Sequence, residues 1–247
     1  MAGARQIRDG EAVFVGMRLP LLAFCLAKST HAPGAVGLFE NGIVRDAPAA
    51  ELLHTMSDPP NVAGAAWCTS MQNVTALLAQ GSVGLGFIGG AQVDRFGNVN
   101  TSYIGDPARP TTRLPGSGGA CDIAALAGRT VVILEHSPRR LVERVDYVTS
   151  PGYGDGPGWR RRVGLPGGGP SAVITTLAVL TFEAESAEAV LASYHPGTDP
   201  AAVRAATGWE LRSRPDVCET PPPSEEELAI IRSYDPEGFW TGRRSEG

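Results

Sequence analysis

AVFVGMRLPLLAFCLAKSTHAPGAVGLF, residues 12–39, is the stretch of sequence that decides the fold. Residues 12–16 form an apolar run that is typical of a buried strand. Residues 20–29 begin with proline and place apolar side chains at helical spacing, which predicts a helix. Residues 35–39 then predict a second buried strand. Strand, helix and strand within about thirty residues form a βαβ unit, whose two strands we expect to be parallel.

Later segments extend this α/β pattern. The apolar runs at 83–90 and 130–136 predict buried strands, and residues 74–80 predict a helix. Residues 171–184 alternate between the two faces and predict two antiparallel strands joined by a tight turn. We therefore expect an α/β fold with an open, mostly parallel sheet that becomes mixed and is flanked by helices.

Two further helices are predicted near the C-terminus. The first covers residues 199–208 and is closed by Gly208. The second lies within residues 221–236, with Ser224 as the N-cap and acidic residues in the first turn. No segment between these elements has the composition of a linker. We predict a single domain that spans residues 1–247.

Composition narrows the function classes. The formal net charge is -5 and no basic stripe is present, which argues against a nucleic-acid partner. The N-terminus lacks an apolar signal core, and the longest apolar stretch is too short to cross a bilayer. The cysteines are scattered and form no C-x-x-C pair, which argues against a zinc site and suits a reducing compartment. We expect a soluble, cytoplasmic protein with no metal and no membrane partner.

Glu40 is the first candidate for chemistry. It follows the predicted strand 35–39 directly and precedes Asn41 and Gly42. In an open α/β sheet, ligands bind at the carboxyl ends of the strands. Gly42 permits a sharp turn, and Asn41 tolerates unusual backbone angles. Glu40 would then project into a crevice, although on position alone a solvated glutamate in an ordinary turn is the simpler interpretation.

Two glycine-rich loops are the next candidates. The first follows a predicted strand and contains Gly89, Gly90, Ala91 and Gln92. Its continuation, from Asp94 to Asn98, is typical of a hairpin turn. The second loop opens a predicted helix and contains Gly116, Ser117, Gly118, Gly119 and Ala120. Small residues let a ligand approach main-chain N–H groups, which can face a carbonyl oxygen or a phosphate. Each loop can also be an ordinary glycine turn.

Other reactive side chains form weaker patterns. The four histidines show no paired spacing and no H-E-x-x-H motif, so structural roles are favoured. Cys121 lies beside the second glycine loop, but no partner histidine is evident for a thiol nucleophile. The clusters Arg139–Arg140 and Arg160–Arg162 could meet a phosphate, although solvated surface charge is the simpler interpretation.

Taken together, these segments resemble family I coenzyme A-transferases, and within them the β subunit of glutaconate-type enzymes. The resemblance rests on LFENG around Glu40, on FIGGAQVDRFGNVN and on IGDPARPTTRLPGSGGA. It continues through VDYVTSPGYGDGPGWRRRVGLPGGGP and the C-terminal segments, so it covers nearly the whole chain. It implies a β-subunit-like fold with Glu40 as the covalent nucleophile. One departure stands out, because glutaconate-type chains usually have Glu-Ser-Gly where this chain has Glu-Asn-Gly.

The resemblance also implies a mechanism and a partner. Glu40 would carry CoA as a glutamyl thioester, and the glycine loops would supply oxyanion and CoA contacts. The acyl-CoA thioester would be a substrate, and no permanently bound cofactor is expected. The family's other glycine loop belongs to an α subunit, so we expect an αβ or α2β2 hetero-oligomer. A CoA-thioester hydrolase, a C–C cleaving acyl-CoA enzyme and a non-catalytic acyl-CoA-binding subunit remain as alternatives.

Overall fold

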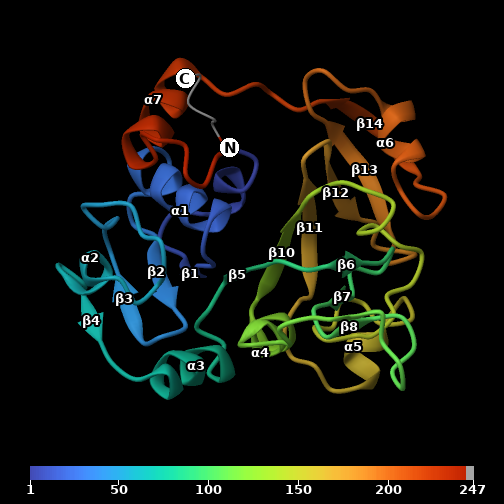
Figure 1. Cartoon of the computed structure of the whole chain (residues 1–247), viewed down its shortest axis with the longest axis horizontal. Helices are drawn as coiled ribbons and strands as arrows, with labels where there is room; N and C mark the ends of the chain where they lie inside the picture. The colour runs from blue at the N-terminus through green and yellow to red at the C-terminus, as the bar shows by residue number, and fades with distance from the viewer. Residues whose placement is uncertain (243–247) are drawn as a thin grey trace. The chain divides into compact units, whose positions relative to one another are not determined.

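The computed structural model describes residues 1–242 of the chain (Figure 1). These residues divide into two compact units. The first contains Met1–Phe87 and the C-terminal part from Pro223, and the second contains Ile88–Pro222. This division does not test whether the units unfold together, so the single domain over 1–247 stays a prediction.

The first unit contains a mixed sheet with the strand order β5-β1-β2-β3-β4. Its strands are β1 (Ala12–Phe14), β2 (Val36–Phe39), β3 (Ile43–Arg45), β4 (Trp67–Cys68) and β5 (Leu85–Ile88). Strands β5, β1 and β2 are parallel, whereas β3 and β4 are added in antiparallel fashion. The parallel β1–β2 pair confirms the predicted βαβ unit.

Helices pack around this sheet. They are η1 (Ala4–Gln6), α1 (Leu19–Ser29), α2 (Pro59–Val62), α3 (Met71–Ala79) and α7 (Glu225–Tyr234). Helix α1 packs against α7 (Figure 1), and its Phe24 is 1% exposed. The Phe24 ring lies 2.8 Å from where a Cβ at position 37 would stand, so strand β2 needs Gly37 to let the helix approach.

The second unit contains the strand order β14-β13-β12-β11-β10. The strands are β10 (Arg129–Leu134), β11 (Pro170–Thr175), β12 (Ala178–Phe182), β13 (Ala189–Tyr194) and β14 (Ser213–Glu219). Strands β10 and β11 are parallel, β11, β12 and β13 are antiparallel, and β14 is again parallel to β13. The antiparallel pair predicted at 171–184 and the change to a mixed sheet are confirmed.

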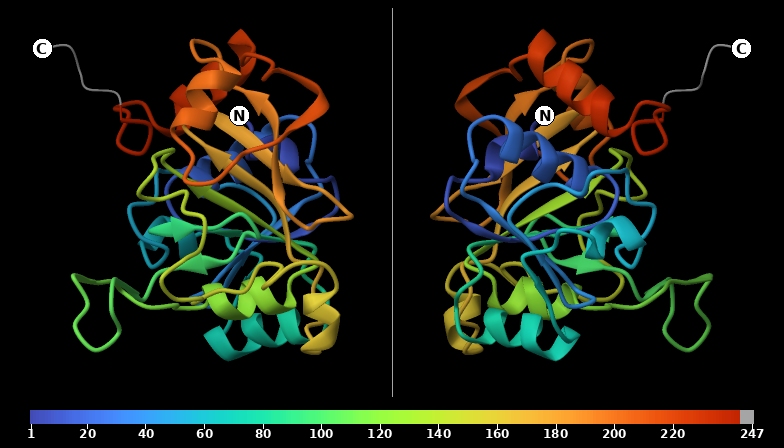
Figure 2. Two further views of the ribbon diagram at one scale, coloured as in Figure 1. Left: turned by 90° about the vertical axis from the view of Figure 1, so that its right-hand side faces the viewer. Right: turned by 90° about the vertical axis from the view of Figure 1, so that its left-hand side faces the viewer.

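Short elements decorate the second unit. Two small hairpins pair β6 (Gln92–Val93) with β7 (Val99–Asn100) and β8 (Tyr103–Ile104) with β9 (Thr112–Arg113). The helices are α4 (Ala120–Leu126), α5 (Trp159–Arg162) and α6 (Pro200–Ala205). In both views of Figure 2 the green β8–β9 hairpin extends away from the rest of its unit.

The two C-terminal helix predictions have different outcomes. Ser224 caps α7, its side chain accepts from the Glu227 N–H, and the Glu227 carboxylate accepts from the Ser224 N–H, so the predicted cap is confirmed. The closure of α6 by Gly208 is wrong, because α6 ends at Ala205. The Gly208 N–H instead donates to the Leu141 carbonyl oxygen at 2.8 Å. No helix among residues 1–242 is long and apolar enough to span a membrane.

Candidate active site

Glu40 lies in the tight turn that joins β2 to β3. The Gly42 N–H donates to the Phe39 carbonyl oxygen at 3.0 Å, and Phe39 pairs with Ile43 across the hairpin. Glu40 and Asn41 are thus the two central residues of the turn, and Glu40 is partly exposed. The structure therefore presents the Glu40 carboxylate from the carboxyl end of a buried strand, as the sequence predicts.

Gly42 is required by the geometry of this turn. Its φ is +99°, a backbone conformation that residues with a side chain rarely adopt. A Cβ at this position would overlap the main-chain oxygen of Thr69 and lie 2.8 Å from its carbonyl carbon. The Thr69 N–H donates to the Gly42 carbonyl oxygen at 2.8 Å, which fixes the segment before α3 against the turn. Gly42 therefore sets the position of the turn that carries Glu40.

Asn41 attaches the other side of the turn to residues 47–63. Its Nδ2 donates to the Met56 carbonyl oxygen at 2.6 Å and lies 3.3 Å from the Ser57 hydroxyl. The Nδ2 of buried Asn61 donates to the same Met56 oxygen at 2.7 Å. Asn41 thus makes specific contacts, beyond tolerating a turn conformation.

Arg18 is a feature that sequence reasoning missed. It precedes α1, it is exposed, and its φ of 68° is one of two positive values among the described non-glycine residues. Its guanidinium carbon lies 5.7 Å from the centre of the Trp240 ring. Backbone strain of this kind costs about 1–3 kcal/mol and clusters at functional positions. No sequence pattern indicates it, because positive φ at an arginine depends on tertiary structure.

The first glycine loop, Gly89–Gln92, uses at least one of its main-chain N–H groups within its own unit. The Ala91 N–H already donates to the Asn100 carbonyl oxygen at 2.9 Å. Neither Gly89 nor Gly90 donates its N–H to any of the turn and loop acceptors within residues 1–242. A Cβ at position 90 would clash with Val99, so the loop needs glycine there for packing.

Gln92 has a structural role in this loop. Its side chain is 5% exposed, and its Oε1 accepts from Asn100 Nδ2 at 2.7 Å and from the Asp146 N–H at 3.1 Å. Its Nε2 donates to Asp146 Oδ2 at 3.3 Å. The Gln92 side chain is therefore occupied inside the unit, which leaves the main chain of the loop as the part that can contact a ligand.

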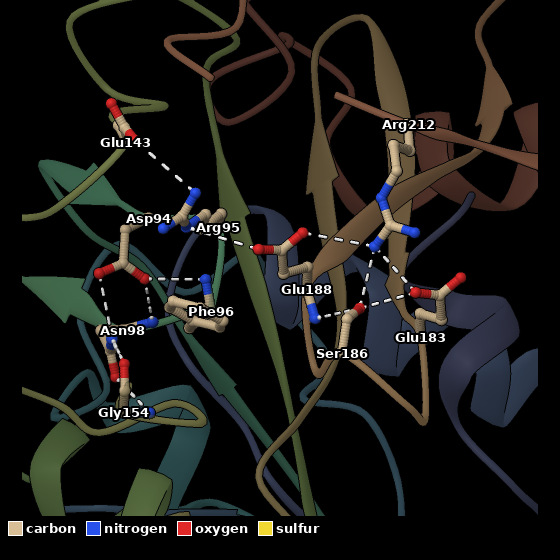
Figure 3. A network of polar contacts seen from close by, with 10 residues as sticks. All are labelled: Asp94, Arg95, Phe96, Asn98, Glu143, Gly154, Glu183, Ser186, Glu188 and Arg212. Carbon is tan, nitrogen blue, oxygen red and sulfur yellow. Dashed lines mark hydrogen bonds and ion pairs between the residues drawn. The ribbon is translucent and has the colours of Figure 1, made fainter. Parts of the chain in front are cut away.

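The turn from Asp94 to Asn98 is the predicted hairpin turn (Figure 3). The Asp94 carboxylate accepts from the main-chain N–H groups of Phe96 and Asn98, each at 3.0 Å. Burial raises the pKa of Asp94, although these hydrogen bonds favour the carboxylate. The Nε of Arg95 lies 3.6 Å from Glu188 Oε1 and forms an ion pair in the network of Figure 3. This network stabilises the hairpin and contains no acid–base pair suited to catalysis.

The second glycine loop, Gly116–Ala120, leads into α4 as expected. The Gly116 N–H donates to the Thr101 carbonyl oxygen at 2.8 Å, and its φ is +95°. The Ala120 N–H donates to the Ser117 carbonyl oxygen at 3.0 Å. The Cys121 sulfur lies 3.9 Å from the Gly118 carbonyl oxygen. The loop is a defined turn of partly exposed residues, of which Gly118 is exposed, and this is compatible with ligand contact.

The alternative nucleophiles have little support, and one arginine of the predicted cation clusters is buried. None of the four histidines hydrogen-bonds a cysteine within residues 1–242, and buried His136 lies between Thr175 and Thr207. Burial raises the pKa of the Cys25 thiol to about 12. No group of three or more His, Cys, Asp or Glu side chains in this part of the chain is arranged to hold a metal. Arg160 is 7% exposed and so is no phosphate ligand on the surface.

The predicted site residues therefore fall into two sets. Glu40, Asn41 and Gly42 form one turn in the first unit, and both glycine loops belong to the second unit. Within each set the local geometry agrees with the predicted turn or loop. A carboxylate held on a glycine turn is a group that can form a covalent adduct in acyl transfer.

Comparison with known proteins shows the family. The coenzyme A transferase family model matches residues 1–206, and the chain belongs to this family. Two relatives are each the B subunit of a CoA-transferase. The chain is 39% identical over 236 residues to that of the 3-oxoadipate enzyme of Pseudomonas knackmussii, covering 95% of this chain and 90% of that one. It is 38% identical over 240 residues to that of the glutaconate enzyme of Acidaminococcus fermentans, covering 94% and 89%.

Solved structures agree with this assignment. The crystal structure of glutaconate coenzyme A-transferase from Acidaminococcus fermentans matches with a TM-score of 0.92 and 34% identity, over 98% of this chain and 95% of that one. The decarboxylase AibA/AibB matches with a TM-score of 0.83 and 27% identity, over 97% and 93%. The mixed sheet flanked by helices is thus that of glutaconate CoA-transferase, and the same scaffold also serves a decarboxylase.

Proposed function

We propose that this chain is the β subunit of a heteromeric CoA-transferase that moves CoA from an acyl-CoA to a carboxylic acid through a glutamyl-CoA thioester on Glu40. The observation that carries the proposal is the turn itself. A carboxylate stands at the carboxyl end of buried strand β2, on a turn that Gly42 and Asn41 hold to two different segments. This arrangement supports a fixed nucleophile more than a solvated surface glutamate.

The bonds formed and broken in the proposed reaction are consistent with an ionised carboxylate as the nucleophile. Glu40 attacks the thioester carbonyl carbon, the C–S bond breaks, and CoA leaves as a thiolate while an acyl-glutamyl anhydride forms. The thiolate then attacks the glutamyl carbonyl carbon and expels the first acid as a carboxylate. A second carboxylate takes CoA by the same steps in reverse. No net proton transfer is needed, so a histidine base is not demanded.

The glycine loops would serve the oxyanions and the CoA chain. Each addition step places negative charge on a former carbonyl oxygen, and preorganised N–H donors stabilise such charge. We assign this role to the N–H groups of Gly89 and Gly90, which are not donors in the turn and loop hydrogen bonds of residues 1–242. We assign the loop Gly116–Ala120 to CoA contact. The partner would be an α subunit, since both relatives above are named as one subunit of their enzyme.

A second candidate is a CoA-thioester hydrolase or a C–C cleaving acyl-CoA enzyme. The observation that favours the C–C cleaving enzyme is the match to the decarboxylase AibA/AibB, which uses the same scaffold. Acceptor dependence separates the readings, because a transferase needs a second carboxylate and a hydrolase needs only water. The assay combines the chain with its α subunit, and mass spectrometry follows acyl-CoA donors against carboxylate acceptors.

Trapping of the adduct tests the role of Glu40. Incubation with an acyl-CoA and no acceptor should build up the glutamyl-CoA thioester. Borohydride should then lower the mass of the Glu40 peptide by about 14 Da, the change from a carboxylic acid to an alcohol in this covalent scheme. Hydroxylamine should give a hydroxamate at the same residue, and Glu40→Gln should show neither product. Adduct at Cys121, or at no residue during proven turnover, would remove the glutamate mechanism.

A further inference from the structure

Arg45 is a buried arginine at the end of β3, five residues after Glu40. It is 3% exposed, and its guanidinium donates to five main-chain carbonyl oxygens. The acceptors, at 2.7–3.3 Å, are those of Ala47, Pro48, Pro60, Asn61 and Ala63. These bonds join the two ends of the segment 47–63. Arg45 therefore closes this segment into a loop that is attached to the strand leaving the Glu40 turn.

The middle of this closed loop is the part that contacts the turn. Met56 lies near its centre, and the Met56 carbonyl oxygen accepts from both Asn41 and Asn61 at 2.6 and 2.7 Å. A second tie within the loop comes from Asp58, whose carboxylate accepts from the main-chain N–H groups of His54 and Thr55 at 2.7 and 3.0 Å. The Met56 carbonyl that Asn41 contacts therefore belongs to a segment that is ordered by its own hydrogen bonds.

The amide of Asn41 contacts the loop through its nitrogen. Its Oδ1 is buried and has no hydrogen-bond partner among the described residues, and the same holds for Asn61. What Asn41 does provide is one short bond that fixes the residue next to Glu40.

We propose that Asn41 and Arg45 are positioning residues for Glu40. Asn41 holds the turn to the Met56 carbonyl, and Arg45 holds the loop that carries this carbonyl. The inference rests on the proposed function, since it assigns these residues to the placement of the nucleophile. Displacement of a reacting group by about 1 Å can cost about 100-fold in rate, so the loss of such a tie should appear in the chemical step.

The experiment uses the complex with the α subunit and three variants. Asn41→Ala removes the bond to Met56, and Arg45→Lys keeps the charge but loses the planar fork that reaches both ends of the loop. Ser224→Ala is the matched control, because it removes one capping interaction of α7 in the same unit. Each variant is measured for its melting temperature, for kcat and KM, and for the rate of glutamyl-CoA formation at Glu40.

The expected result is selective. Asn41→Ala should lower kcat and the rate of adduct formation about 10- to 100-fold, and leave KM for acyl-CoA within about twofold of the wild type. Ser224→Ala should keep kcat within about twofold despite a lower melting temperature. If Arg45 acts through Asn41, the effects of the two substitutions should not add. The double variant should then have a kcat less than about threefold below that of Arg45→Lys alone.

Three outcomes would overturn the inference. Turnover of Asn41→Ala within about twofold of the wild type, with Glu40 still trapped in the wild type, would sink the positioning role and leave the proposed function intact. Independent, multiplicative losses in the double variant would show that Arg45 does not act through Asn41. No adduct at Glu40 in wild-type enzyme during turnover would remove the proposed function itself, and the inference with it. If Arg45→Lys fails to fold, the comparison of Asn41→Ala with the wild type and Ser224→Ala still tests the positioning role of Asn41.

Discussion

Replacement of Gly42 by alanine tests the geometry of the Glu40 turn directly. Two separate penalties follow from the structure. The backbone at φ +99° is costly for a residue with a Cβ, and the Cβ would overlap the Thr69 main-chain oxygen. That oxygen belongs to main chain that is itself bonded to the Gly42 carbonyl through the Thr69 N–H at 2.8 Å. The segment therefore cannot move aside without breaking this hydrogen bond.

The magnitude can be estimated from these two penalties. Forcing a residue with a side chain into a sparsely populated region costs about 1–3 kcal/mol. Overpacking against a fixed neighbour adds about 1–3 kcal/mol. We expect Gly42→Ala to lower the free energy of unfolding by about 2–6 kcal/mol, a large share of the 5–15 kcal/mol that is typical of a folded protein.

Gly81→Ala is the matched control. Gly81 follows α3 with φ +73°, and a Cβ there would meet no atom within 4 Å. Gly81→Ala carries the penalty for positive φ but introduces no clash, so it should lower the free energy of unfolding by only about 1–3 kcal/mol. Urea unfolding of both variants gives the difference, with unchanged m-values required for the comparison. If Gly42→Ala costs no more than Gly81→Ala, the close approach of Thr69 to the turn is wrong.

Four further predictions concern stability and thiol reactivity. Burial lowers the pKa of His136, so the unfolded chain binds its proton more readily. The contribution of neutral His136 to the free energy of unfolding should be fully present above about pH 6.5, the unperturbed histidine pKa, and should be lost as the pH falls below this value. The urea midpoint of His136→Gln should therefore fall less with decreasing pH than that of the wild type. Ser224→Ala should cost about 1 kcal/mol in urea unfolding, because it removes a capping box. Cys68 should react with a thiol reagent at pH 8, whereas Cys25, with its pKa raised to about 12, should react only on unfolding. If residues 1–247 are one domain, calorimetry should show one transition, and two resolved transitions would contradict this.

The local parts of the fold could be predicted from the sequence. The βαβ unit depends on apolar periodicity, a proline at the start of α1 and short punctuation, all of which lie within residues 12–39. The Glu40 turn has a local signal too, because Gly42 follows the apolar strand after two residues and a glycine there can take the positive φ that a short hairpin loop needs. For this reason the position of Glu40 was predictable, although β3 and β4, with three and two residues, were too short to detect.

Gly208 shows why a local signal can mislead. A glycine after a helical pattern is typical of a helix C-terminus, where it adopts positive φ. Here Gly208 is absent from the positive-φ glycines, and a Cβ on it would lie 2.5 Å from the Leu141 carbonyl oxygen. The glycine is required because two main-chain segments approach each other. That need arises from residues 67 positions apart, and no window of the sequence contains it.

The arginines show the same limit more sharply. Arg160 belongs to a cluster that predicts surface charge or a phosphate contact, yet its guanidinium donates to the carbonyl oxygens of Gly167, Pro151, Gly152, Ala124 and Ala125. Arg45 does the same in the first unit, and both side chains are almost fully buried. An arginine that is buried without a carboxylate has no signature in composition or spacing.

A common cause links these two arginines to the glycine and proline content. The chain has 31 glycines and 20 prolines, so much of it forms irregular loops. The carbonyl oxygens of such loops do not take part in the regular hydrogen bonds of helices and sheets. Proline also contributes no N–H, and buried carbonyls must find donors elsewhere. A guanidinium carries five N–H donors in one rigid plane, which suits a cluster of converging loop carbonyls. The buried arginines are therefore what such a loop-rich fold requires, and Arg45 meets this requirement beside the turn that carries Glu40.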